Sequence, residues 1–112
     1  MSNIPFQHID WSEVPTVDFP GESGMATWQT LQWEGLRVRI VIYSPNYLAD
    51  HWCQKGHIVH CLKGEFISEL SNGEKFVLTA GNSYVVSNNM SSHRSISSTG
   101  ATLLIVDGEF LQ

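Results

Sequence analysis

The sequence is poor in basic residues: Lys and Arg together number six, against eleven Asp and Glu, and the formal net charge is -5. The six are scattered, so no basic patch is present to bind phosphate groups, and we expect no nucleic-acid partner. Long apolar runs are also lacking, since none approaches the ~20 residues that a membrane-spanning helix needs. Residues 1–10 lack the basic start and apolar run of a signal peptide. These absences predict a cytoplasmic protein that does not interact with membranes.

Cysteine is scarce as well, with only Cys53 and Cys61. A single disulfide across so short a loop would be an unusual scaffold, and cytoplasmic thiols are kept reduced, so we predict two free thiols. The chain does not need a disulfide, because 42% of its 112 residues are hydrophobic and can form one packed core. Each cysteine is therefore interpreted as either core or ligand.

Proline is unevenly distributed, and three of the four prolines lie in residues 1–24, together with the Gly21 to Gly24 turn. This composition predicts an extended N-terminal arm over residues 1–24 with no regular structure of its own. Residues 25–112 then form a single domain.

From residue 25 onward the apolar residues alternate with a period of two, which is typical of β-strands. Turn-forming residues separate the alternating runs, and the Asn72-Gly73 pair is the clearest hairpin signal. No stretch has the 3.6-residue period of a helix. The predicted strands span 25–32, 36–43, 57–63, 66–70, 75–78, 83–86, 93–97 and 102–106. The sequence therefore predicts an all-β antiparallel sandwich or barrel.

Potential metal ligands are concentrated in residues 50–57. His51 and Cys53 are two positions apart, so on a strand their side chains point to the same face. The turn at 54–56 contains a glycine and allows His57 to return to that face, and the distant His93 is a candidate to complete the site. For each residue alone the ordinary alternatives are a surface histidine and a core cysteine. Three such residues within seven positions favour a metal site.

The spacing of this cluster resembles the first sequence motif of the cupins, which is G, five residues, H-x-H, three or four residues, E, six residues, G. His51 corresponds to the first histidine of the motif, Cys53 to the second, His57 to the glutamate and Gly64 to the closing glycine. Residues 50–53, Asp-His-Trp-Cys, also resemble the signature of an uncharacterised group, the DHCW-motif cupins.

The second cupin motif is G, five residues, P-x-G, two residues, H, three residues, N. Gly81 matches its opening glycine, Ser87 replaces its proline, and His93 lies one residue beyond the expected histidine. The resemblance covers about residues 35–108. It implies a jelly-roll or β-barrel of the cupin type that holds one divalent metal ion, and a homodimer, since small cupins commonly dimerise.

The predicted ligand set, His51, Cys53, His57 and His93, differs from the three histidines and one glutamate usual in cupins. A thiolate among imidazoles favours zinc as the ion, with iron or nickel as alternatives. If Cys53 is not a ligand, the three histidines resemble the non-haem iron site of thiol dioxygenases, which are also cupins.

Further residues are candidates for the surroundings of the ion. Asp50 is interpreted either as a hydrogen-bond acceptor for a ligand imidazole or as a turn residue. Arg37 and Arg39 share a strand face with Tyr43 and would suit a carboxylate in the pocket, although the alternation rule favours the solvent face for them. Tyr84 and Arg94 flank the second motif.

Nearby residues are interpreted as outside the site. His60 is three positions after His57 and faces the opposite side of the strand, Cys61 packs in the barrel, and Trp52 points away from the metal.

Three functions fit these residues. The first is metal-dependent binding or conversion of a small polar metabolite, by Lewis-acid or non-haem-iron oxygen chemistry. The second is a non-catalytic module that senses a metal or a ligand, and the third is a structural zinc site. The absent glutamate removes an obvious general base, which argues against acid–base isomerisation.

Overall fold

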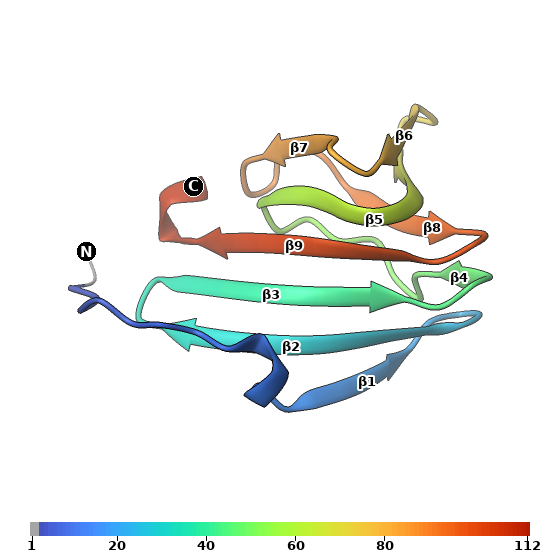
Figure 1. Ribbon diagram of the computed structural model, residues 1–112. Coiled ribbons are helices and arrows are strands. Elements are labelled where there is room, and N and C mark those ends of the chain that lie inside the picture. Colours follow the sequence, from blue (N-terminus) through green and yellow to red (C-terminus); the bar gives the residue numbers. More distant parts are fainter. Residues whose placement is uncertain (1–2) are drawn as a thin grey trace.

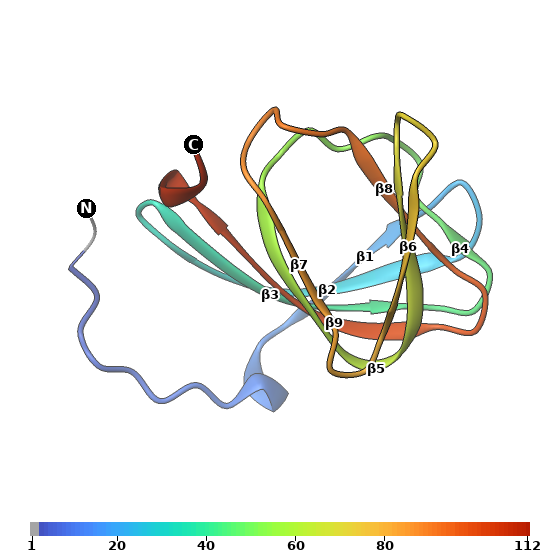
Figure 2. The ribbon, with the colours of Figure 1, turned by 90° about the horizontal axis from the view of Figure 1, so that it is seen from above.

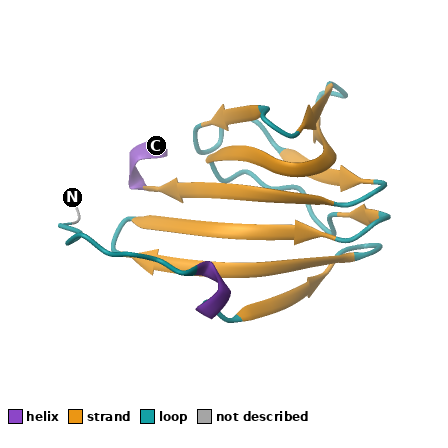
Figure 3. Cartoon of the chain, viewed as in Figure 1, coloured by secondary structure: helices purple, strands orange, loops and turns teal. Residues whose placement is uncertain are grey.

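The structure, a computed structural model, describes residues 3–112, and its regular secondary structure is almost entirely β-strand (Figure 3). The elements are η1 (Trp11–Glu13), β1 (Thr16–Pro20), β2 (Met25–Trp33), β3 (Leu36–Tyr43), β4 (Tyr47–Leu48), β5 (His57–Leu70), β6 (Lys75–Thr79), β7 (Ser83–Val86), β8 (His93–Ser97), β9 (Ala101–Gly108) and η2 (Glu109–Leu111). This confirms the all-β prediction. None of the described helices is long and apolar enough to cross a membrane.

The strands pair antiparallel throughout, in the order β1-β2-β3-β9-β5-β8-β4, with β6 and β7 also pairing with β5. β5 pairs through its first half with β9 and β7, and through its second half with β8 and β6. The sheet therefore curls over itself into an antiparallel barrel of the jelly-roll type (Figures 1 and 2).

The long strand β5 contains 14 residues where the sequence predicts two separate strands, 57–63 and 66–70. Its pairing with β9 shifts register between Cys61 and Lys63, so a bulge bends the strand without ending it. Gly64 follows with a φ of 75°, in the left-handed region, where a Cβ would collide with the carbonyl oxygen of Gly100. Here the glycine marks a bend within one strand.

The N-terminal segment is more regular than predicted, because Thr16–Pro20 forms β1 and pairs in full register with β2. Phe19 packs on Trp28 with 4.3 Å between ring centroids, and Thr27 donates a hydrogen bond to Asp18. An edge strand needs a partner on one side only and tolerates a proline at its end. The expectation of no regular structure is therefore wrong for this segment.

The inward face of β3 is the opposite of the one that alternation favours. Val41 is 1% exposed and Tyr43 is buried, whereas Ile42 is 45% exposed. Arg39 lies on the same inward face and is 4% exposed. Arg37 and Arg39 are therefore not on the solvent face, because the fold supplies a buried carboxylate, Asp107, for both guanidinium groups.

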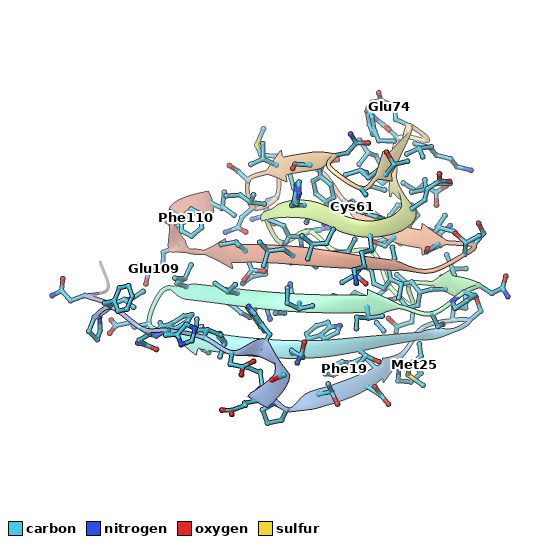
Figure 4. The ribbon with its side chains drawn as sticks, viewed as in Figure 1. Phe19, Met25, Cys61, Glu74, Glu109 and Phe110 are labelled. Atoms are coloured by element: carbon cyan, nitrogen blue, oxygen red, sulfur yellow. The ribbon has the colours of Figure 1, made fainter. Side chains whose placement is uncertain are left out.

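The hydrophobic core lies inside the barrel, and Cys61 of β5 is fully buried in it (Figure 4). Its thiol donates to the carbonyl oxygen of Lys63 at 3.4 Å, at the bulge. Both cysteines are free, as predicted. Cys61 is accordingly a packing residue.

Candidate metal centre

Three of the four predicted ligands lie together inside the barrel. One donor atom from each of Cys53, His57 and His93 lies within 4.8 Å of the others. Backbone pairing accounts for this, since Cys53 and His93 form an isolated bridge in which each N–H donates to the other's carbonyl, at 2.8 and 3.0 Å. His57 is the first residue of β5, and its side chain is buried beside them.

Both histidine rings are oriented by an oxygen acceptor on Nδ1. His57 Nδ1 lies 3.0 Å from Asp107 Oδ2, and His93 Nδ1 lies 3.2 Å from the carbonyl oxygen of Ser91. Because these oxygens only accept, Nδ1 donates in each ring, and Nε2 faces the cluster. His57 Nε2 is 3.5 Å from Cys53 Sγ, whereas His93 Nε2 is buried without a hydrogen-bond partner in residues 3–112.

Asp107 of β9 was not predicted from the sequence, although it holds this arrangement together. It is 1% exposed and accepts hydrogen bonds from Arg37, at 2.9 and 3.0 Å, and from Arg39, at 3.0 Å, besides that from His57. Burial raises the pKa of the Asp107 carboxyl, but these three donors outweigh burial and hold it well below its usual range. The signal in the sequence is that Asp107 continues the inward alternation of Leu103 and Ile105, one residue beyond the predicted strand.

The pKa of Cys53 is lowered by its histidine neighbours. Burial raises the pKa of the thiol, but the adjacent imidazoles of His57 and His93 outweigh burial and lower it to about 5. Burial lowers the pKa of His57, and its contacts with Asp107 and Cys53 more than compensate, so the net shift is upward. At neutral pH Cys53 is therefore a thiolate, the form that binds metal ions.

A cavity of about 210 Å³ opens beside the cluster. Its lining includes all the residues that the sequence singled out except Asp50: His51, Cys53, His57, His93, Arg37, Arg39, Tyr43, Tyr84 and Arg94. Apolar groups, among them Val41 and Ile105, form part of its wall. The arrangement suits a small molecule held next to the donor cluster.

His51 lines this cavity but is not among the three clustered donors. Its side chain is 75% exposed, and its Nδ1 lies 2.6 Å from Asp50 Oδ1. Asp50 therefore contacts the ring of a predicted ligand, at an exposed position. The role of His51 as a fourth ligand stays a prediction.

The other candidates surround the cavity in different ways. The Tyr43 hydroxyl donates a hydrogen bond to Ser95 Oγ at 3.0 Å. The Tyr84 and His93 rings pack edge to face, with 5.9 Å between ring centroids. Arg94 pairs with Glu69 at 2.7 Å and lies 4.5 Å from the centroid of the Trp52 ring.

No protein-family model matches the sequence, and no curated protein matches it significantly. Solved structures do resemble the fold. An RmlC-like cupin from Shewanella frigidimarina is 21% identical, with a TM-score of 0.72 over 92% of this chain and 91% of that one. A predicted oxalate decarboxylase from Thermotoga maritima is 16% identical, with a TM-score of 0.78 over 91% and 98% of the two chains.

A third structure, of Fe(II)-HppE with an alternative substrate, is 15% identical, with a TM-score of 0.73 over 93% of this chain and 60% of that one. At these identities the likeness concerns the fold alone. The antiparallel barrel described above, with its donors inside, therefore has the cupin-type fold that the sequence motifs imply.

Proposed function

We propose that this chain holds one divalent metal ion through Cys53, His57 and His93, and binds or converts a small polar metabolite in the adjoining cavity. The observation that carries the proposal is the buried Nε2 of His93, which has no hydrogen-bond partner within residues 3–112 although the ring is fixed by its Nδ1 contact with Ser91. An unpaired polar atom in the interior is costly, and a cation among three donors would satisfy it.

The donor set fits the group. One thiolate and two imidazole nitrogens favour zinc over magnesium or manganese, with iron or nickel as alternatives. Asp107 would hold His57 with Nε2 toward the ion, as carboxylates commonly do for ligating histidines. The ion would supply Lewis-acid polarisation of a carbonyl or a water molecule, or oxygen chemistry if it is iron.

Three enclosed ligands beside a cavity favour an exchangeable coordination position over a filled structural site. His51 stands at the exposed side of the cavity, where we propose that it completes the ligand set when no metabolite occupies that position. A non-catalytic sensor remains the second candidate, because the same open position would admit a ligand without reaction.

The Cys53→Ser variant tests the thiolate contribution. We expect it to bind cobalt(II) without the near-ultraviolet thiolate-to-metal absorption that the wild-type complex shows, and to lose its preference for zinc. The measurement is a cobalt titration followed by absorption spectroscopy, then zinc competition. If the variant has the same spectrum and metal selectivity as the wild type, Cys53 is not a ligand and the histidines alone bind the metal.

We further propose that the chain belongs to the DHCW-motif group, that it forms a homodimer in the cytoplasm, and that it divides into an arm at 1–24 and a barrel at 25–112. The Asp-His-Trp-Cys sequence, the free thiols and the apolar side chains exposed on the outer sheet face, such as Ile42 and Ile58, support them.

A further inference from the structure

The guanidinium of Arg39 is buried and incompletely paired. It donates one hydrogen bond, from Nη2 to Asp107 at 3.0 Å, and its Nε has no partner among residues 3–112. Its Cζ lies over the Trp28 ring, 4.3 Å from the ring centroid, in a cation–π contact. A buried guanidinium ordinarily uses its in-plane N–H groups on acceptors. This one lines the cavity with donors to spare.

Arg39 shares its only carboxylate partner in the described residues with Arg37. Arg37 binds both oxygens of Asp107 through Nε and Nη2, which is the paired geometry of one guanidinium with one carboxylate. Arg39 shares that carboxylate and has no other ion-pair partner in the described part of the chain. Because Arg37 occupies both oxygens of that carboxylate, most of the N–H groups of the buried Arg39 are left without an acceptor among residues 3–112, which is costly in the interior.

We propose that the cavity binds a small carboxylate. The guanidinium of Arg39, which lies over the Trp28 ring, holds its carboxylate group, and the rest of the molecule is directed toward Cys53, His57 and His93. This proposal specifies the substrate class of the function proposed above, and the role of the metal ion depends on that function. Recognition of the anion depends on Arg39.

The volume and the lining of the cavity narrow the class of carboxylate that it can bind. About 210 Å³ is smaller than the roughly 300–1,000 Å³ of sites for drug-sized ligands, so a short-chain acid fits. A divalent ion and the Cys53 thiolate together carry a net single positive charge, so loading the metal strengthens the attraction for an anion. Val41, Ala49 and Ile105 in the wall suit a short apolar part of the acid.

The test is calorimetric titration of zinc-loaded protein with malonate and with its uncharged analogue malonamide. We expect one equivalent of malonate to bind, at least tenfold more tightly than malonamide. The Arg39→Gln variant is expected to bind malonate at least tenfold more weakly while its zinc content is unchanged. Lys75→Gln removes an exposed positive charge from β6 and serves as the matched control, with unchanged malonate affinity.

Equal affinity for malonate and malonamide, absence of malonate binding, or preference for inorganic phosphate would overturn the proposal. So would an unchanged malonate affinity in a folded Arg39→Gln variant. If that variant does not fold, Arg39→Lys replaces it, with weaker malonate binding expected because the planar fork is lost. Zinc content, measured on the same samples, separates the two proposals. Zinc without malonate binding contradicts the carboxylate class alone, and malonate binding without zinc contradicts the metal alone.

Discussion

Replacing His57 with Ala abolishes stoichiometric zinc binding, with an expected loss in affinity of more than about 100-fold. His57 belongs to the donor group, with its Nε2 3.5 Å from Cys53 Sγ, and Asp107 orients its ring. Its removal leaves one thiolate and one enclosed imidazole, too few for a stable site. Competition with a chromophoric zinc chelator measures the affinity directly.

His60→Ala is the matched control, because His60 lies on the same strand three residues later and contacts Ser83 at 2.6 Å, outside the donor group. Its zinc affinity should equal that of the wild type. If His57→Ala also keeps wild-type affinity, the three-donor site does not exist as described.

Replacing Asp107 with Asn is expected to destabilise the fold by about 3–5 kcal/mol. The substitution keeps the shape of the side chain but removes the charge that Arg37, Arg39 and His57 share. Arg39 is almost fully buried, so its guanidinium would be left in the interior without a counter-ion. Urea unfolding of metal-free protein, monitored by tryptophan fluorescence, measures the free energy of unfolding.

Asp18→Asn provides the comparison, since Asp18 is an exposed carboxylate on edge strand β1 whose only side-chain hydrogen bond in the described chain comes from Thr27. We expect a change of less than about 1 kcal/mol there. Similar small losses in both variants would mean that the buried arginine–aspartate network does not stabilise the barrel.

Much of the fold could be predicted because its signals are local. Period-two alternation and turn residues located seven of the nine described strands in whole or in part. The two strands not predicted are β1, which ends in a proline, and β4, which has two residues. The two predicted halves of β5 are one strand because a bulge, not a turn, follows Cys61. Alternation alone does not distinguish a bulge from a turn, since both interrupt the two-residue period at a glycine.

Part of the donor group could be predicted because two of its residues are close in sequence. Cys53 and His57 are four residues apart, and motif spacing added His93. Asp107 was missed because it lies 50 residues from His57 and 68 from Arg39, and nothing local marks the pairing. The same separation in sequence explains why alternation predicted the wrong inward face for β3. Arg39 lies inside because β9 supplies its counter-ion, Asp107.

The metal content of wild-type protein, purified without a metal-affinity tag and measured by plasma mass spectrometry, tests the central claim most directly. We expect one equivalent of a divalent transition metal per chain, with zinc favoured, held by Cys53, His57 and His93. Folded protein that contains no such metal, and takes up none when zinc is supplied, would contradict it.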